Sequence, residues 1–273
     1  KKAKYDRKPY KVTFSETPIP KKPLDIIQID IFISSPDLYL SCVDKFSKYA
    51  ALISIKSRSI PDVRAGIIKL ISVIGTPKLI VSDNEPSIKS VEIRGFLDSL
   101  GIQIYFSPSD RSEVNGTVER FHSTLAEIFR CIKPKYTELS NKEIFKIAVS
   151  LYNTSVHSVT NLKPSEIFFG IRDGEERSLN MEQMIENRNK LYDEVILKLE
   201  KKQNQMLEYR NTSRELEPTL ETDETVYLKR QGVKSKTKNK YNPVKVTTDR
   251  RKTFNDDKNR KLHKANIRRK PRY

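Results

Sequence analysis

The sequence contains no tryptophan, and cysteine and histidine are almost as scarce. Its two cysteines, Cys42 and Cys131, lie far apart, and its histidines are His122, His157 and His263. No spacing among these residues resembles a structural zinc site, and two distant thiols do not make a disulfide framework. The composition therefore predicts a protein of a reducing compartment that folds around an ordinary hydrophobic core.

Long apolar runs are also missing, and no signal peptide is visible at the N-terminus. A membrane-spanning helix needs about 20 consecutive apolar residues, and no run in this sequence approaches that length. The pattern excludes a membrane span and predicts no membrane partner. With 273 residues and 36% hydrophobic content, the chain is long enough for one full core and one or two smaller modules.

Positive charge is plentiful, and its distribution divides the chain into parts. The net charge is +17. Residues 1–24 carry net +6 and residues 216–273 carry net +11, whereas residues 25–215 contain 26 basic and 26 acidic side chains. Basic segments of this density bind phosphate backbones by releasing counterions. The two basic ends indicate a nucleic-acid partner, and a tail that only adds solubility is the alternative.

The chain begins without methionine, and we expect it to be a piece of a longer polypeptide. Residues 1–24 contain four prolines and no periodic pattern, which predicts an extended linker. Three strand-like runs follow, separated by short polar turns that favour antiparallel pairing; they span 26–33, 38–44 and 49–55. Strands are also expected at 78–82 and 102–106, and helices at 63–74, 88–100, 114–132, 141–156 and 164–169.

This order, β-β-β-α-β-α-β-α, predicts an α/β layered domain with a mixed sheet over residues 25–175. Residues 176–215 are polar and helical in pattern, so we expect a helical connector. Residues 216–273 contain two strand-like runs, TVYLKR and VKVTT, before a basic end. We expect them to form a small β-barrel with a basic tail.

Three carboxylates stand at the edges of the predicted core, on three separate elements. Asp30 interrupts the apolar run IIQIDIFI, where an ionised carboxylate is costly unless something compensates it. Asp83 follows the short strand KLIVS, and strand ends in α/β sheets are where ligands collect. Glu119 lies on the long helix, next to Val118 and one turn from His122.

Carboxylates that converge repel one another, and a divalent cation removes that penalty. Oxygen ligands without Cys or His favour Mg²⁺ or Mn²⁺ over zinc. Two such ions about 3.5–4 Å apart can activate a nucleophile and stabilise the leaving oxygen in phosphoryl transfer. Each residue also has an ordinary alternative. Asp30 can pair with a base, Asp83 can be a turn residue, and Glu119 can be a solvated helix charge.

The segments around these carboxylates resemble the integrases of retroviruses and gypsy-type LTR retrotransposons. IIQID, VSDNE and VNGTVERFH match the D,D-35-E signature of that family, since residues 84–118 make a gap of 35 between Asp83 and Glu119. Similar gypsy-type strings, in the same order, are YLSCVDKFSKY, GTPKLIVSDNEPSIKS, SPSDRSEVNGTVERFHSTL and YNTSVHSVTNLKPSEIFFG. Two positions depart from the pattern: Glu85 replaces a glycine, and His122 stands where the family often has asparagine.

The resemblance implies a ribonuclease H-like core and an SH3-like β-barrel within residues 216–273. It implies a DNA integrase, a polynucleotidyl transferase and endonuclease that processes the 3′ ends of element DNA and transfers them into host DNA. The implied catalytic residues, which would hold two Mg²⁺ or Mn²⁺ ions, are Asp30, Asp83 and Glu119. The implied DNA contacts are Arg111, Ser112, Asn115, Arg120 and His122.

By the same resemblance, the partners are element-end DNA, host target DNA and further copies of the chain, because two joined ends need two active sites. Chromatin is a further partner that the resemblance to integrases allows. The implied location is the nucleus of the host cell, and also the virus-like particle as a Pol product. KKAKYDRKP resembles the stretch after the family's N-terminal zinc domain, so we expect that domain to be trimmed from this chain. The alternatives are a DDE transposase and a domesticated, non-catalytic DNA- or chromatin-binding protein.

Overall fold

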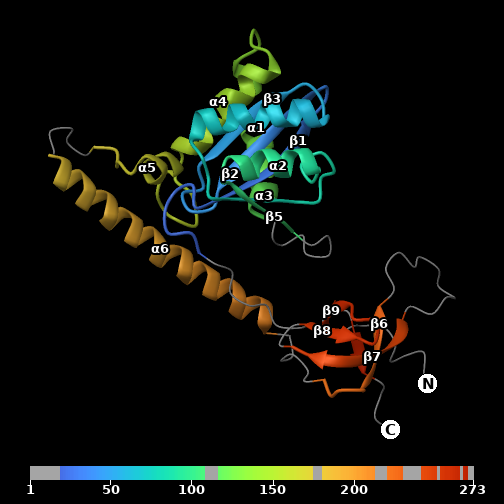
Figure 1. The fold of residues 1–273 in the computed structure, drawn as a ribbon. Helices are drawn as coiled ribbons and strands as arrows, with labels where there is room; N and C mark the ends of the chain where they lie inside the picture. The colour runs from blue at the N-terminus through green and yellow to red at the C-terminus, as the bar shows by residue number, and fades with distance from the viewer. Residues whose placement is uncertain are drawn as a thin grey trace. The chain divides into compact units, whose positions relative to one another are not determined.

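The computed structural model describes residues 19–107, 116–174, 180–212, 220–229, 241–250, 253–264 and 267–269. The described residues form two compact units, and the boundary between them lies between Lys202 and Gln203. Figure 1 shows the elements of both units.

The first unit is built on a five-stranded mixed sheet in the order β3-β2-β1-β4-β5. β1 (Ile26–Ser34), β2 (Asp37–Asp44) and β3 (Ala50–Ile55) pair antiparallel. β4 (Leu79–Ser82) pairs parallel with β1, and β5 (Gln103–Phe106) pairs parallel with β4. The predicted order of strands and helices is confirmed, as is the antiparallel pairing of the first three strands.

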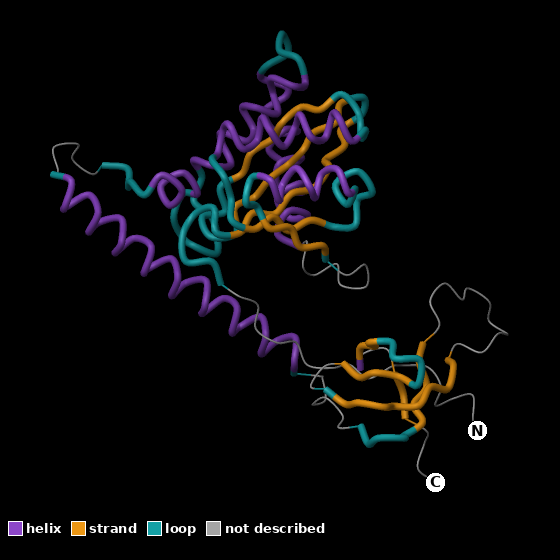
Figure 2. Tube along the Cα trace, viewed as in Figure 1, coloured by secondary structure: helices purple, strands orange, loops and turns teal. Residues whose placement is uncertain are grey.

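Helices cover both faces of this sheet, as Figure 2 shows. α1 (Ile60–Ile74) and α2 (Val91–Ser99) pack on one face, while α3 (Gly116–Ile132) and α4 (Asn141–Thr154) pack on the other. Serine caps the N-termini of α1, α2 and α4, where its side chain accepts a backbone N–H that has no partner within the helix. A short helix, α5 (Pro164–Phe169), follows.

Side chains alternate between the two faces along β1, as the period of a strand requires. Ile27 and Ile29 are buried in the core cluster that includes α1 and α2. Phe32 packs instead into the cluster formed with α3 and α4. Asp30 shares a face with Phe32, so the central strand of the core presents a carboxylate toward α3.

The segment predicted as a helical connector contains α6 (Met181–Asn211), a helix of 31 residues. Leu191, Val195 and Leu199 of α6 are buried in a cluster with the β2–β3 turn and α5. The middle of this helix, residues 191–199, is therefore packed into the first unit. None of the described helices is long and apolar enough to cross a membrane.

The second unit contains a five-stranded antiparallel sheet in the order β10-β6-β7-β8-β9. Its strands are β6 (Thr225–Lys229), β7 (Tyr241–Asp249), β8 (Thr253–Asp256), β9 (Lys261–His263) and β10 (Ile267–Arg269). Val226, Val246 and Phe254 are fully buried in its small core. β6 contains TVYLK of the predicted run TVYLKR, whose last residue lies outside the described residues, and β7 contains VKVTT. Within the described strands, β9 and β10 remain at the two ends of the order, and the sheet is not closed into a barrel.

Candidate active site

Asp30 and Asp83 come from neighbouring parallel strands. β4 pairs with β1 so that Val81 lies opposite Gln28. Continuing that register by two residues brings Asp83, directly after β4, beside Asp30 in β1. Both aspartates are half-buried. The turn after β4 is closed by the Asp83 carboxylate, whose Oδ1 accepts the backbone N–H of Glu85 at 3.1 Å.

Glu119 lies in the first turn of α3, and its side chain is exposed. One turn further along the helix, His122 reaches toward the sheet, with its Nδ1 4.0 Å from Oδ2 of Asp30. The sequence periodicity that assigned one face of this helix to the core is confirmed. The buried side chains on that face are Val118, Phe121 and Leu125.

Ser41 joins His122 to the backbone of Asp30. It is the cross-strand partner of Asp30 in the β1–β2 hairpin. Its Oγ donates to the carbonyl oxygen of Asp30 at 2.9 Å and lies 2.7 Å from Nε2 of His122. Because a hydroxyl has one proton, Nε2 must donate in the second bond, so Nδ1 of the neutral imidazole faces the carboxylate. Sequence reasoning missed Ser41, although a two-residue turn at Ser35 and Pro36 implies this pairing.

Asp30 is buried and lies close enough to other carboxylates for its own negative charge to be disfavoured. Burial raises the pKa of Asp30 to about 6, and the negative charges of Asp83, Glu119 and Glu85 act in the same direction. The hydrogen bond from the N–H of Ile31, at 2.7 Å, opposes this rise but does not cancel it. Burial and the negative charges nearby therefore make ionisation of the Asp30 carboxyl unfavourable.

His122 does not offset the cost of ionising Asp30 near neutral pH. Burial lowers the pKa of His122 to about 4, so the imidazole is neutral there. Its ring packs against Phe32, with the two centroids 4.8 Å apart. His122 therefore orders the surroundings of Asp30 through packing and through its hydrogen bond to Ser41, and it supplies no positive charge.

These residues have the chemistry of a divalent-cation site. Asp30, Asp83 and Glu119 offer only oxygen ligands, which suit Mg²⁺ and Mn²⁺. A bound cation would also remove the repulsion that raises the pKa of Asp30. Within the described ranges, no group of three or more His, Cys, Asp or Glu side chains is already assembled as a metal site. The cation would therefore have to draw these carboxylates closer together.

Glu85 is a fourth carboxylate at this site, and sequence reasoning treated it only as a departure from glycine. Its backbone is not in the left-handed region, so the turn does not require a glycine. The described non-glycine residues that do have positive φ are Leu24, Lys48, Asn161, Asp223 and Asn259. The Glu85 carboxylate lies 3.9 Å from Nη1 of Arg58.

Of the five predicted DNA contacts, two lie on α3 and three lie outside the described residues. Arg120 is exposed on α3, and its Nε donates to the carbonyl oxygen of Gly116 at 3.1 Å. His122 lies beside Asp30, with its Nδ1 4.0 Å from Oδ2 of that residue. Outside the described residues lie Arg111, Ser112 and Asn115.

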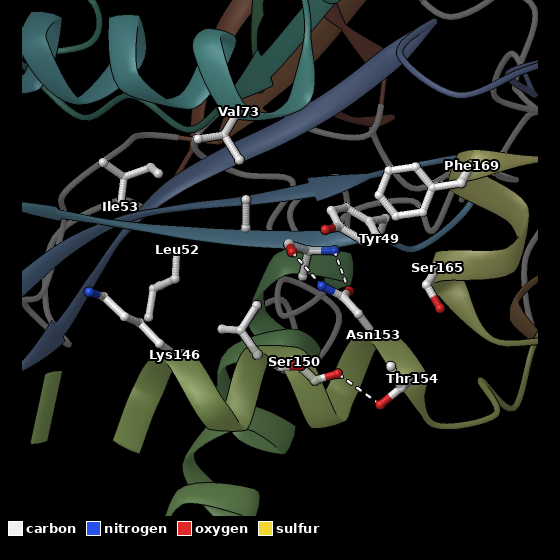
Figure 3. Close-up of a pocket in the computed structure, with 13 residues that line it drawn as sticks. Tyr49, Leu52, Ile53, Val73, Lys146, Ser150, Asn153, Thr154, Ser165 and Phe169 are labelled. Atoms are coloured by element: carbon white, nitrogen blue, oxygen red, sulfur yellow. Dashed lines mark hydrogen bonds between the residues drawn. The ribbon is translucent and has the colours of Figure 1, made fainter. Parts of the chain in front are cut away.

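A cavity of about 360 Å³ opens along the edge strand β3, in a different part of the first unit. Figure 3 shows Tyr49, Val73, Lys146 and Phe169 around it, and Asn153 of α4 reaching the strand. None of the four carboxylates lines this cavity. It is therefore separate from the candidate active site.

The fold and the site together define a class of protein. A mixed five-stranded sheet flanked by helices, with Asp30 in its central strand, is the architecture of a ribonuclease H-like core. Residues 20–112 match the integrase core domain family, a range that includes Asp30 and Asp83. This part of the chain is thus similar to an integrase core domain.

Its relatives are retrotransposon polyproteins. The chain is 37% identical, over 97% of its length, to the retrovirus-related Pol polyprotein from transposon opus of Drosophila melanogaster, of which it covers 26%. It is 43% identical, over 60% of its length, to the corresponding polyprotein from transposon gypsy, of which the match covers 16%. The chain therefore spans about a quarter or less of these relatives, and it is similar to part of the gypsy and opus Pol polyproteins.

A solved structure has the same fold. It is a cryo-EM structure of the simian T-cell lymphotropic virus intasome in complex with PP2A regulatory subunit B56 gamma. The match covers 96% of this chain and 85% of that chain, with a TM-score of 0.62 and 16% sequence identity.

Proposed function

We propose that this chain is a DNA integrase of an LTR retrotransposon or endogenous retrovirus, which processes 3′ ends and transfers strands with the help of divalent metal. The observation that carries the proposal is Asp30, a carboxylate in the central strand whose ionisation is opposed by Asp83 and Glu119. The integrase core domain over residues 20–112 supports it, as does the 37% identity to the opus polyprotein.

Asp30, Asp83 and Glu119 would hold two Mg²⁺ or Mn²⁺ ions. Bound there, the ions would activate a nucleophile and stabilise the leaving oxygen of an in-line phosphoryl transfer. The protein's own part is alignment and charge. β1 and the N–H of Ile31 fix Asp30, and Ser41 fixes its backbone carbonyl, so its oxygens keep one orientation during the reaction.

The reaction takes two DNA substrates in turn. Water first cuts the element DNA near its 3′ end, and the freed 3′-hydroxyl then attacks a phosphodiester of host DNA. Neither step needs a covalent bond to the protein. Ser41 suits this scheme, because its hydroxyl is engaged by the Asp30 carbonyl and by His122 and is not free to act as a nucleophile.

DNA contacts are proposed on both units. Arg120 and His122 share a helix with Glu119 and would meet DNA near the cations, together with Arg111, Ser112 and Asn115. The net charge of +11 in residues 216–273 supports a second, sequence-independent contact with the phosphate backbone. We assign the family's SH3-like barrel to this region, and its five antiparallel strands are compatible with that assignment.

The proposed division of the chain follows the charge and the elements. Residues 1–24 form a basic linker, residues 25–175 the catalytic core, residues 176–215 the helical connector and residues 216–273 the basic C-terminal domain. The partners would be element-end DNA, host DNA and further copies of the chain, with chromatin as an additional contact. The protein would act in the nucleus of the host cell and be carried in virus-like particles.

A strand-transfer assay tests this proposal. Labelled duplexes with the element's own ends are incubated with the purified chain and a target plasmid, in Mg²⁺, in Mn²⁺ or in EDTA. We expect processed ends and joined products with either metal and none in EDTA. A DDE transposase would instead also release the element from flanking DNA on both strands. A domesticated DNA- or chromatin-binding protein would bind the duplex without any product, and that result would overturn the proposal.

A further inference from the structure

A group of basic side chains lies on the α3 side of the sheet, and of its members only Arg120 has a role in the site described so far. It comprises Lys45 and Lys48 in the turn between β2 and β3, Arg120 of α3, and His157 after α4, and is termed the basic cluster. Lys45, Lys48 and His157 are half-buried, whereas Arg120 is exposed. These residues come from three segments that are far apart in the sequence.

The first link between these segments joins α4 to the start of β3. The Asn153 side chain accepts the N–H of Ala50 at Oδ1, at 2.8 Å, and its Nδ2 donates to the carbonyl oxygen of Ala50 at 2.9 Å (Figure 3). The amide thus takes the place of a neighbouring strand at the free edge of β3. Since Ala50 is two residues after Lys48, the end of α4 is held beside the β2–β3 turn.

The second link joins α3 to the same place. The ring of Tyr152 contacts the ring of Phe121, with centroids 5.0 Å apart, and the ring of His157, at 6.3 Å. Arg120 adjoins Phe121 in α3. Lys48, Arg120 and His157 are therefore brought together by contacts that do not involve their own charges.

The positive charges in the basic cluster oppose one another. Burial lowers the pKa of Lys48 to about 8, with Lys45 and Arg120 acting in the same direction and Asp44 against it. Burial, together with the charges of Lys48 and Arg120, lowers the pKa of His157 to about 4. At Asp30, nearby negative charges disfavour the ionised carboxyl in the same way.

Within the part of the chain that the structure describes, no ion pair involves Lys45, Lys48 or Arg120, and the charge of Asp44 offsets the crowding at Lys48 only in part. Asp44 is nearby, but its oxygens already accept hydrogen bonds from Ser47 and from the N–H of Leu24. The ammonium of Lys48 is nevertheless held in position, since Nζ donates to the carbonyl oxygen of Lys45 at 2.7 Å. A cation that is fixed, half-buried and without an ion pair is the arrangement that favours binding of an anion.

We propose that the basic cluster binds a phosphate group of a DNA backbone, on the same DNA that reaches the carboxylates. Arg120 directly follows Glu119 in α3, so DNA bound at the carboxylates passes the exposed Arg120. A backbone phosphate supplies the negative charge and the acceptor oxygens that the cluster lacks. The choice of DNA as the source of the phosphate rests on the proposed function.

The salt dependence of DNA binding tests this site in the full chain. A double variant, Lys48→Gln with Arg120→Gln, removes two charges from the cluster. The matched control, Arg64→Gln with Lys69→Gln, removes two charges from exposed positions of α1, on the other face of the sheet. Binding of a labelled duplex is followed by fluorescence anisotropy in EDTA over a series of salt concentrations.

We expect the cluster variant to lose about 10-fold or more in affinity near 0.1 M salt. Its slope of log affinity against log salt should be shallower by about 2. The control should keep the parent slope, and Lys48→Arg, which retains the charge, should do the same. If Lys48→Gln lowers the melting temperature, Arg120→Gln alone, at an exposed position, should still flatten the slope by about 1.

Equal slopes for the cluster variant and the control would overturn the phosphate site. Strand transfer is measured on the same preparations, so that failure of the phosphate site can be distinguished from failure of the proposed function. An active parent with equal slopes would remove the phosphate site alone. An inactive parent whose DNA binding still depends on Lys48 and Arg120 would remove the integrase assignment and retain the site.

Discussion

Oδ2 of Asp30 and Nδ1 of His122 lie 4.0 Å apart, and the hydroxyl of Ser41 contacts both residues. The three residues come from two paired strands and the helix that carries Glu119. This arrangement fixes the helix that carries Glu119 against the strand that carries Asp30. It makes His122 a positioning residue, because its imidazole is neutral near pH 7 and acts through Ser41.

His122→Ala should lower strand transfer about 10- to 100-fold, as expected for a residue that orients a metal-binding neighbour. His122→Asn, which keeps a hydrogen-bond donor for Ser41, should recover part of that loss. The measurement is kcat and KM for strand transfer, with the melting temperature as the check on folding. Loss of stability without a change in kcat would contradict the positioning role.

Asp30→Asn should change stability in a pH-dependent way in the absence of metal. The pKa of folded Asp30 is raised to about 6, so its protonated form favours the fold. That contribution is fully present below about pH 4 and is lost as the pH rises through about 6. The variant should therefore be more stable than the parent by about 1–3 kcal/mol at pH 8 and equal to it near pH 4.

Urea unfolding at the two pH values, in EDTA, measures this difference. Asp98→Asn, an exposed charge change on α2, is the control and should match the parent at both. Added Mg²⁺ should stabilise the parent and not the Asp30→Asn variant. An Asp30→Asn variant that is less stable than the parent at pH 8 in EDTA would argue against crowded carboxylates.

Phe121→Ala should destabilise the first unit by about 3–5 kcal/mol, because it opens a cavity in the core. Phe121 is almost fully buried between α3 and α4 and contacts the ring of Tyr152. Thr124→Ala, at an exposed position of the same helix, should change the free energy of unfolding by no more than about 0.5 kcal/mol. Comparable losses in the two variants would show that this face of α3 is not the packed one.

Truncation after Leu216 should weaken DNA binding and flatten its salt dependence, because residues 216–273 carry net +11. The first unit should keep its melting transition, since its core clusters contain no residue beyond Leu199. An unchanged slope of log affinity against log salt would show that the basic C-terminal region does not touch DNA.

The sequence predicts the first unit well because its local signals agree with its packing. α4 and α5 begin at the expected residues, where Ser140 forms a capping box with Glu143 and Pro164 occupies the first turn. The alternation along β1 places Asp30 on the face opposite Ile29 before any partner is known. Apolar residues that recur every three or four positions along α3 mark its core face, and Glu119 lies off that face.

The second unit is harder to predict for a physical reason. β8, β9 and β10 contain only three or four residues each, too few for a periodic pattern to emerge. Their strand conformation depends on pairing partners along the sheet, which no local pattern specifies. The role of Ser41 was missed for a related reason. It depends on the register of the hairpin, which is a property of two strands together.

Strand transfer by Glu119→Gln tests the central claim most directly, that Asp30, Asp83 and Glu119 together form the metal-dependent centre. The substitution removes one negative charge and almost no volume from an exposed position. We expect strand transfer in Mg²⁺ to fall by several orders of magnitude, while the melting temperature and DNA affinity stay at the parent values. A Glu119→Gln chain that retains more than about a tenth of the parent activity would contradict the account, because an active centre that depends on three carboxylates cannot work with two.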